Sequence, residues 1–273
     1  WSFNKGDAVF DEAAPDYTSR PDAIFWDTAP PLQGFRGWKE YRKAAENWSK
    51  NGIDQAIILV VDTEHFKAWR YKDVVWNIMH CGIRLTFAGG EKANHLCRGT
   101  LIWEWEDDRW KLAHEVFSAP VGPRDSVFQA NRPEDPRIKP DLELMDRARQ
   151  VASAWGNGST RGLAKRLKEF YVDDDKLSIY TPWHPFIAYQ GWQAFEHGLK
   201  RYIAASIKHV DIKINNDLEA QRRDKIAWST ATLHIETELV NGETVSGDAR
   251  QTLIWYQAED GWRILHEHFS FPQ

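Results

Sequence analysis

The sequence predicts an α+β protein that contains two tandem copies of one folding unit. The first observation is a repeat, because residues 72–120 align with residues 224–272 without a gap and both copies end on Trp-(Arg/Lys)-x-x-His-Glu-x-Phe-Ser. The second is that, in each copy, apolar residues first recur at helical spacing and then alternate with polar residues over long stretches. That order is typical of helices that precede an antiparallel sheet.

Tryptophan usage supports the duplication. Of the 15 tryptophans, ten form pairs at equivalent places in the two copies: Trp1/Trp155, Trp38/Trp192, Trp76/Trp228, Trp103/Trp255 and Trp110/Trp262. We expect the paired residues to be structural core, since aromatic side chains bury the largest apolar area. The unpaired ones are the better candidates to line a site, although a core position is the commoner role of any single one: Trp26, Trp48, Trp69, Trp105 and Trp183.

Each copy is expected to begin with helices. In the second copy, apolar residues at helical spacing run through residues 141–171. The first copy retains only the tail of this element in residues 1–17, so its first helix is predicted to be incomplete. A Gly-Trp pair then opens a second amphipathic helix in each copy, at Gly37-Trp38 and at Gly191-Trp192.

From residue 54 the pattern alternates as in β-strands. Four strands are predicted in each copy: Ala56–Val61, Val74–Phe87, Leu96–Trp105 and Trp110–Ser118, then Val210–Ile214, Ile226–Val240, Ala249–Gln257 and Trp262–Phe271. The two longest strands turn at Ala88–Glu91 and at Val240–Glu243, where Asn241-Gly242 is a hairpin signal. Domains are therefore predicted at 1–120 and 141–273, with a Pro-rich linker at 121–140.

Composition narrows the class of protein. With 42% hydrophobic and 27% charged residues, and no run of about 20 apolar residues, a globular protein that does not span a membrane is expected. The net charge of −5 without a Lys/Arg block argues against nucleic acid as a partner. Two cysteines, Cys81 and Cys97, imply no disulfide framework and favour a reducing, cytoplasmic compartment. The chain begins at Trp1 without a methionine, which leaves an exported form open.

The run Asp22–Asp27, the Gly-Trp helix start and the closing motif Trp262–Ser270 resemble the nuclear transport factor 2-like superfamily, in particular its SnoaL-like and ketosteroid-isomerase-like branches. The resemblance implies that each unit is a cone, in which a strongly curved antiparallel sheet wraps around helices and leaves an apolar cavity. Two such units usually pack sheet against sheet, so it also implies an intramolecular pseudo-dimer that is a monomer or a low homo-oligomer. The family includes lyases, dehydratases, isomerases and non-enzymatic association domains, so the fold leaves function open.

The resemblance also assigns residues to the two cavities. It turns inward, in the first copy, His80, Arg84, Leu101, Trp103, Glu115 and Phe117, and in the second copy, His234, Gln251, Trp255, Glu267 and Phe269. Asp27 falls at the position of the general base of ketosteroid isomerases, where the second copy has Tyr180 and Thr181. The oxyanion-stabilising tyrosine of those enzymes falls at Trp1 and Trp155, and their inward acid at Gly99 and Gln251, which puts steroid isomerisation in doubt.

These residues favour a cofactor-independent acid–base enzyme: a lyase, a dehydratase or an isomerase acting on a hydrophobic, aromatic small molecule. Asp27 or His80 would take a proton, Arg84 would stabilise an oxyanion, and Glu115 would add a second carboxyl group. Some family members cleave or dehydrate aromatic alcohols, among them cofactor-free lyases of lignin-derived diaryl compounds, and such a substrate is compatible with aromatic walls. We expect no metal, because His266 and His268 lack a third ligand at a suitable spacing.

Each candidate residue has a structural alternative. Asp27 would then cap the turn that begins at Thr28, and His80 and His234 would be hydrogen-bonded sheet histidines. The duplicated acids would form ion pairs, Glu115 with Arg98 and Glu267 with Arg250. The corresponding alternative for the whole chain is a non-catalytic small-molecule-binding or assembly module.

Overall fold

The computed structural model describes residues 2–4, 9–27, 34–118, 137–156, 158–182 and 188–271. They form two compact units, one within residues 2–118 and one within residues 137–271. Within these ranges, no helix is long and apolar enough to cross a membrane. Several sequence expectations lie outside the described residues: those on Trp1, on the turn at Thr28, on Trp183 and on most of the linker, residues 121–136.

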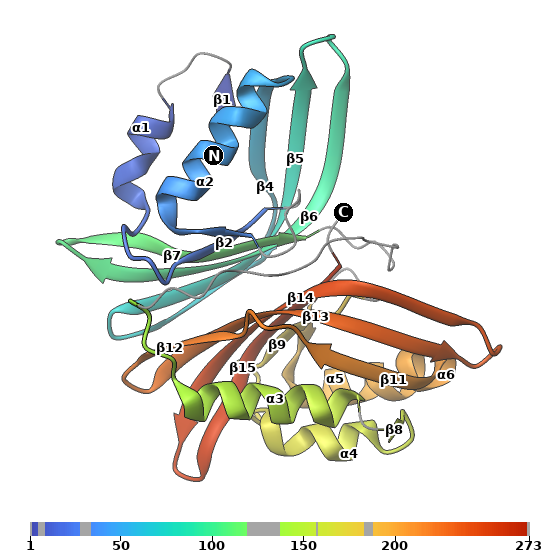
Figure 1. Cartoon of the computed structure of the whole chain (residues 1–273). Helices are drawn as coiled ribbons and strands as arrows, with labels where there is room; N and C mark the ends of the chain where they lie inside the picture. The colour runs from blue at the N-terminus through green and yellow to red at the C-terminus, as the bar shows by residue number, and fades with distance from the viewer. Residues whose placement is uncertain are drawn as a thin grey trace. The chain divides into compact units, whose positions relative to one another are not determined.

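The first unit is a seven-stranded sheet with helices over one face (Figure 1). Its elements are β1 (Ser2–Asn4), α1 (Val9–Ala13), η1 (Ala14–Asp16), β2 (Ile24–Trp26), β3 (Phe35–Arg36), α2 (Gly37–Lys50), β4 (Ile53–Tyr71), β5 (Val74–Phe87), β6 (Lys92–Glu106) and β7 (Arg109–Ser118). The strand order is β1-β4-β5-β6-β7-β2-β3, in which β4 to β7 form an antiparallel meander and β2 pairs with β7 in parallel.

The second unit repeats this plan (Figure 1). Its elements are α3 (Leu142–Gly156), β8 (Gly158–Ser159), α4 (Leu163–Leu167), η2 (Lys168–Phe170), β9 (Ser178–Tyr180), β10 (Tyr189–Gln190), α5 (Gly191–Gly198), η3 (Leu199–Ile203), α6 (Ala204–Ser206), β11 (Ile207–Ile214), β12 (Glu219–Arg223), β13 (Ile226–Leu239), β14 (Thr244–Ala258) and β15 (Gly261–Ser270). The strand order is β10-β9-β15-β14-β13-β11-β8, and β12 also pairs with β13. The predicted α+β class with two tandem units is confirmed.

Alternation along the strands places one face of each sheet against the helices. In the first unit, Met79 and Cys81 of β5 and Leu101 of β6 join Tyr41 of α2 in one apolar core. In the second unit the equivalent core is larger, because the fifteen-residue helix α3 contributes to it. This helix-facing side of each sheet is called the interior below.

The turn of each long hairpin has one residue more than expected. A two-residue Asn-Gly turn would pair Thr232 with Gln251, but the β13–β14 turn has three residues, 240–242, closed by a hydrogen bond from the Leu239 N–H to the Glu243 carbonyl. The β5–β6 turn is closed in the same way, from the Phe87 N–H to the Glu91 carbonyl. Gly90 and Gly242 take the positive φ that such turns need, 81° and 90°. Because side chains alternate, one extra residue moves every β5 and β13 side chain to the other face.

The Gly-Trp pairs mark the start of α2 and α5 as predicted. Gly37 and Gly191 have φ values of 67° and 76°, in the left-handed region that favours glycine. Each donates its N–H over 2.8 Å, Gly37 to the Ala23 carbonyl and Gly191 to the Leu177 carbonyl. These bonds hold the start of α2 beside β2 and the start of α5 beside β9.

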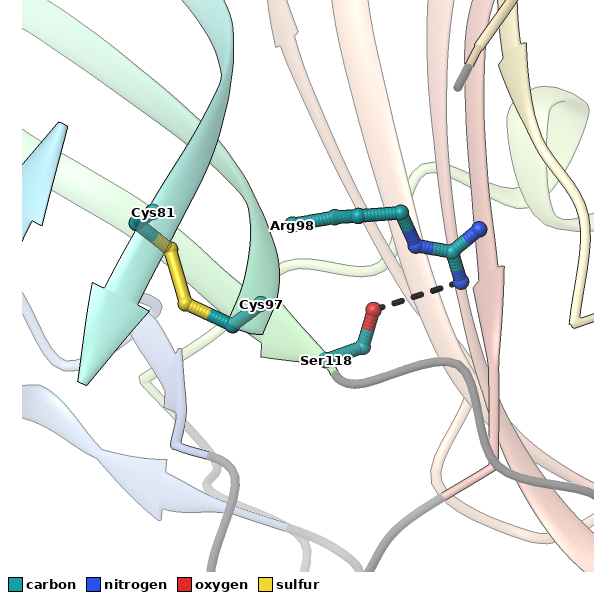
Figure 2. Close-up of a disulfide and its surroundings, with 4 residues drawn as sticks. All are labelled: Cys81, Cys97, Arg98 and Ser118. Carbon is teal, nitrogen blue, oxygen red and sulfur yellow. Dashed lines mark hydrogen bonds between the residues drawn. A yellow bond between two sulfur atoms is a disulfide. The ribbon is translucent and has the colours of Figure 1, made fainter. Parts of the chain in front are cut away.

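Cys81 and Cys97 form a disulfide, although two cysteines implied no disulfide framework in the sequence. They are directly opposite on β5 and β6, and both point into the interior. The sequence separation of 16 residues gave no sign of this pairing, because it depends on the register of the hairpin. Figure 2 shows the disulfide on one side of β6 and the Arg98 side chain on the other.

Candidate acid–base site in the first unit

Four side chains with acidic or phenolic groups meet in the interior of the first unit. Tyr17 follows η1, Asp27 follows β2, Tyr41 lies on α2 and Glu115 lies on β7. Tyr17, Tyr41 and Glu115 are buried, and Asp27 is half-buried. A carboxyl pair bridged by two phenols is therefore enclosed by apolar core.

Hydrogen bonds link these four residues in two pairs. The Tyr41 hydroxyl donates to Asp27 Oδ2 over 3.2 Å, and the Tyr17 hydroxyl donates to Glu115 Oε2 over 3.5 Å. Glu115 Oε1 is buried and has no hydrogen-bond partner among the residues that the structure describes. The Tyr41 hydroxyl also interacts with the Glu115 carboxyl group, so the four residues form one connected cluster.

Burial controls the protonation of this cluster. It raises the pKa of Glu115 to about 8, assisted by the negative charge of Asp27, while the Tyr41 and Tyr17 hydroxyls oppose the rise. Burial first, and then the charges of Glu115 and Asp27, raise the pKa values of Tyr17 and Tyr41 well above their ordinary range. At neutral pH, Glu115 is therefore mainly a neutral acid that can donate a proton.

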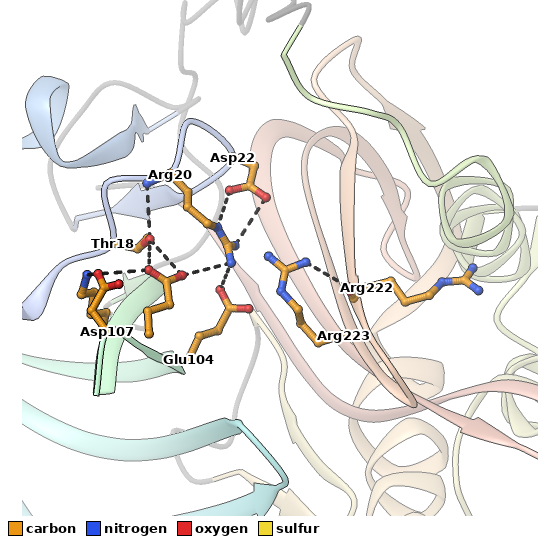
Figure 3. Close-up of polar contacts among 9 residues, drawn as sticks. Thr18, Arg20, Asp22, Glu104, Asp107, Arg222 and Arg223 are labelled. Carbon is orange, nitrogen blue, oxygen red and sulfur yellow. Dashed lines mark hydrogen bonds and ion pairs between the residues drawn. The ribbon is translucent and has the colours of Figure 1, made fainter. Parts of the chain in front are cut away.

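An ion-pair network fixes the segment that carries Tyr17 (Figure 3). Arg20 binds three carboxylates: Asp22 at 2.9 Å, Glu104 at 2.5 Å and Glu106 at 3.2 Å. The neighbouring Thr18 donates its hydroxyl to Glu106 over 3.0 Å and its N–H to the Leu112 carbonyl over 3.0 Å. These contacts hold the Tyr17 backbone against β7 and aim its hydroxyl at Glu115.

Aromatic rings form the walls around this cluster. Trp38 stacks on Tyr17 with ring centroids 4.3 Å apart, and Trp103 donates its indole N–H to Asn77 over 2.8 Å. Trp38, Trp103 and Phe35 are half-buried. Leu101 and Phe117 complete the wall from β6 and β7, so the sequence placed these two residues and Trp103 on the correct face.

The second interior holds the equivalent acid in a different environment. Glu267 is fully buried, its Oε1 accepts the Gln251 amide at 2.7 Å, and its Oε2 accepts the Tyr171 hydroxyl. Burial raises its pKa to about 7, against these two hydrogen bonds. By alignment, Phe195 and Thr181 occupy the positions of Tyr41 and Asp27, so these two positions of the second unit carry neither a phenol nor a carboxyl group.

The SnoaL-like domain model matches the chain twice, over residues 7–122 and 148–273. The chain belongs to this family. The two matches confirm the predicted tandem duplication of a SnoaL-like unit within the nuclear transport factor 2-like superfamily. No curated protein matches the chain.

Three solved structures are similar to a single SnoaL-like unit. A nuclear transport factor 2-like protein of Salmonella enterica is 18% identical, with a TM-score of 0.42, over 48% of this chain and 90% of that one. A hexachlorocyclohexane dehydrochlorinase of Novosphingobium barchaimii is 14% identical, with a TM-score of 0.40, over 49% and 91%. A ketosteroid isomerase-like protein of Erwinia carotovora is 13% identical, with a TM-score of 0.40, over 48% and 95%.

The predicted catalytic residues are split between the two faces of the first SnoaL-like sheet. Asp27 and Glu115 lie together as expected, but the placement of His80 and Arg84 in the cavity was wrong. His80 pairs with Arg98 across the strands, and Arg84 is exposed. The cause is the three-residue turn, which reverses the faces of β5.

The predicted site residues of the second unit also lie partly on the other face of their sheet. His234 points away from the interior and contacts Asp248 at 2.9 Å, with 45% of its side chain exposed. Tyr180 pairs with His268 on β15, whereas Glu267 pairs with Ile179, so Tyr180 lies on the opposite face from Glu267. Gln251, Trp255 and Phe269 do lie in or beside the second interior, Trp255 through an indole bond of 3.0 Å to Ser229.

The duplicated polar residues have partners other than those expected. Arg98 does not pair with Glu115; it lies on the opposite face and donates to Ser118 over 3.4 Å (Figure 2). Glu267 likewise has Gln251 and Tyr171 as partners, and not Arg250 as in the structural alternative. The repeated histidine joins strands, since His114 donates through Nδ1 to the Ile24 carbonyl over 2.7 Å.

Sequence reasoning missed Tyr17 and Tyr41. Tyr17 is repeated as Tyr171, and this pair could have been found by the same alignment that paired the tryptophans. Tyr41 lies on the helix that Gly37-Trp38 opens, and nothing in the sequence places its hydroxyl beside Asp27.

A separate depression of about 800 Å³ lies on the surface of the second unit, beside α4 and α5. Its lining includes Arg161, Lys165 and Trp192. Leu163, Trp192 and Leu199 of the second core also line it, whereas Tyr171, Gln251 and Glu267 do not.

Proposed function

We propose that the interior of the first SnoaL-like unit is the active site of an acid–base enzyme, a lyase, dehydratase or isomerase, whose proton transfers are carried by its own side chains. The observation that carries this proposal is the pairing of Asp27 with a buried, neutral Glu115. Two carboxyl groups in contrasting environments provide one group that accepts a proton and one that donates it.

Asp27 is the base in this proposal. It is half-buried, so a substrate can reach it, and Tyr41 orients it through a hydrogen bond of 3.2 Å. A base held in one orientation by a donor can remove a proton from a carbon that lies next to a carbonyl group or to a leaving group.

Glu115 is the acid. Its pKa of about 8 keeps it protonated at neutral pH, and the hydroxyl of Tyr17 lies 3.5 Å from its Oε2. As charge develops on a substrate oxygen, the acid and the phenols can stabilise it by hydrogen bonds that strengthen in a site from which water is excluded. In an elimination, Asp27 would take a proton from carbon, the electron pair of that C–H bond would form the C=C bond, and Glu115 would protonate the departing hydroxyl, so that an alkene and water form.

The walls favour a planar, hydrophobic substrate. Trp38, Trp103 and Phe35 are half-buried and pack against the core cluster that contains Tyr17 and Tyr41, and aromatic rings stack well on one another. An aromatic alcohol or ketone, including the lignin-derived class, presents both a ring for these walls and an oxygen for Glu115.

The alternative, a non-catalytic binding or assembly module, is favoured by one observation in the second unit. Glu267 has both carboxyl oxygens bound by neighbouring side chains. A satisfied acid supports packing and is not available for proton transfer, so we assign a structural role to the second interior.

The proposal is tested by screening aromatic alcohols and ketones for turnover without an added cofactor. The wild-type protein is compared with Asp27→Asn, Glu115→Gln and the matched control Glu267→Gln. We expect the first two substitutions to abolish most turnover and the control to retain it. Turnover that survives both first-unit substitutions would contradict the proposal, and saturable ligand binding without turnover would favour the binding module.

A further inference from the structure

A second polar cluster lies on the first unit, on the face of the sheet opposite Glu115. Asp62 and His65 belong to β4, and His80 of β5 is the cross-strand partner of Asp62. The register shifts after this pair, so that residues 63–66 oppose the single residue Met79 before Lys67 pairs with Ile78. This bulge in β4 folds His65 back over His80.

The three side chains point their donor atoms at one another. Asp62 Oδ2 contacts Nδ1 of His65 and lies 3.5 Å from Nδ1 of His80. The two imidazole rings stack with centroids 4.8 Å apart and an interplanar angle of 21°. One ligand atom from each residue lies within 4.8 Å of the other two. Ligands of a first-row metal ion at about 2.0–2.2 Å are themselves about 3–3.5 Å apart, so only small side-chain movements separate this cluster from a coordination set.

The cluster is held by the backbone around it. Asp62 Oδ1 accepts the N–H groups of Glu64 and His65, at 3.0 and 3.3 Å, which leaves Oδ2 directed at the two imidazoles. His80 is buried on the sheet, whereas the side chains of Asp62 and His65 are about one-third exposed, at 32% and 34%. An ion could therefore enter from solvent and keep water ligands on that side.

The second unit provides an internal comparison at the same place. Thr232 aligns with His80, and Asp217 Oδ1 accepts both its N–H at 3.0 Å and its hydroxyl at 2.9 Å. Asn215 adds a bond of 2.9 Å to the Thr232 hydroxyl. In the second unit, hydrogen bonds thus satisfy the polar groups at this place. The first unit has two imidazoles and a carboxylate there.

We propose that Asp62, His65 and His80 bind one divalent first-row transition-metal ion. Two imidazoles and one carboxylate are a ligand set that such ions accept, with the remaining positions filled by water. Because the cluster is on the face opposite Glu115, the ion fixes the β4 bulge to β5 and takes no part in the acid–base chemistry proposed for the interior.

The test uses the full chain without a polyhistidine tag, stripped with EDTA and dialysed. Zn²⁺ binding is measured by calorimetry and Co²⁺ binding by its visible absorption, in the wild type, His65→Ala, His80→Thr and the control His95→Ala. His80→Thr introduces the residue of the second unit, and His95 is an exposed histidine on β6. Thermal unfolding with and without Zn²⁺ shows whether every variant is folded.

We expect one equivalent of Zn²⁺ to bind and to raise the melting temperature of the wild type and of His95→Ala. Loss of a direct ligand should weaken binding by more than the 10- to 100-fold, roughly, that follows loss of an outer-shell partner. Two results would overturn the proposal: no saturable binding at one equivalent in the folded wild type, or binding that His65→Ala and His80→Thr leave as strong as His95→Ala does.

Discussion

Glu115 and Glu267 occupy equivalent positions on β7 and β15, and among the residues that the structure describes only Glu267 has partners on both carboxyl oxygens. The difference comes from the strand beside them, where Gln251 in the second unit replaces Gly99 in the first. A β-carbon added at Gly99 would lie 2.9 Å from Phe117 and 3.0 Å from Met79, so these two side chains would have to shift to admit a larger residue there. The duplication thus carries two buried acids, one with an unpartnered carboxyl oxygen and one with both oxygens bound.

The first prediction concerns the pH dependence of turnover. If Glu115 donates a proton, turnover should fall as the pH rises through about 8, because the acid is then ionised. Glu115→Gln should lower turnover and remove this alkaline limb, whereas Glu267→Gln should keep both. The measurement is the pH–rate profile of the three proteins, and an alkaline limb that persists in Glu115→Gln would assign it to another group.

Glu115 should also affect stability in a direction fixed by its raised pKa. The folded state holds the proton more tightly than the unfolded state, so the stabilising contribution is complete below pH 4.5 and is lost as the pH rises towards about 8. Glu115→Gln removes this loss. Its melting temperature, relative to the wild type, should therefore increase between pH 5 and pH 9, and a constant difference would contradict the assignment.

The second prediction compares Asp27, which lies in the first interior, with Tyr180, which faces away from the second interior. Removing a positioned base typically lowers the rate by about 100- to 10,000-fold, so Asp27→Asn should lose most turnover with little change in melting temperature. Tyr180→Phe should be active, because Tyr180 lies on the opposite face from Glu267. A fully active Asp27→Asn variant would contradict the assignment of the chemistry to the first interior.

The third prediction tests Tyr41 as a positioning residue. Tyr41→Phe removes the donor to Asp27 Oδ2 and creates the residue that the second unit has at Phe195. Loss of one hydrogen bond of about 1 kcal/mol should lower kcat by about tenfold or less and leave KM nearly unchanged. An unchanged kcat would show that Asp27 does not need this contact.

The fourth prediction concerns Glu267, the acid with both carboxyl oxygens bound. Gln251→Ala leaves Glu267 Oε1 buried without its amide partner, which should destabilise the fold by about 1–3 kcal/mol. Chemical denaturation is the measurement, and the exposed Gln193→Ala on α5 is the control. Equal stability of the two variants would mean that a solvent molecule or another side chain replaces the amide.

The fifth prediction concerns the disulfide. Protein unfolded in denaturant without reductant should show no free thiol, and two after reduction, since Cys81 and Cys97 are joined. The double variant Cys81→Ser/Cys97→Ser should be less stable by about 2–4 kcal/mol, because the bond closes a loop in the unfolded chain. Two free thiols in the unreduced protein would instead support the reducing compartment expected from the sequence.

The sequence predicted most of the fold because duplication doubles each signal. Trp103 and Trp255 face their interiors as expected, and both Gly-Trp pairs begin a helix. The face of β5 could not be predicted, because it depends on one residue in the turn at 88–90. That residue moved His80 and Arg84 out of the candidate site and brought Cys81 opposite Cys97.

Less of the candidate site could be predicted. Asp27 and Glu115 were found through the resemblance. Their positions along the strands are enough to determine where their side chains point. Tyr17 and Tyr41 reach the site through tertiary packing, from a segment after η1 and from a helix, and local sequence patterns carry no information on such distances. Asp62 and His65 were missed for a similar reason, because a bulge of irregular length places them against His80.

Gly37 and Gly191 have a consequence that concerns chirality. The space beside their α-carbons is sufficient for a methyl group, with the nearest atoms, carbonyl oxygens of Arg20 and Asp174, at 3.4 and 3.6 Å. What excludes an L-alanine is the positive φ, which a D-amino acid adopts without strain. At these two positions backbone strain, and not a clash of the added methyl group, therefore opposes an L-alanine.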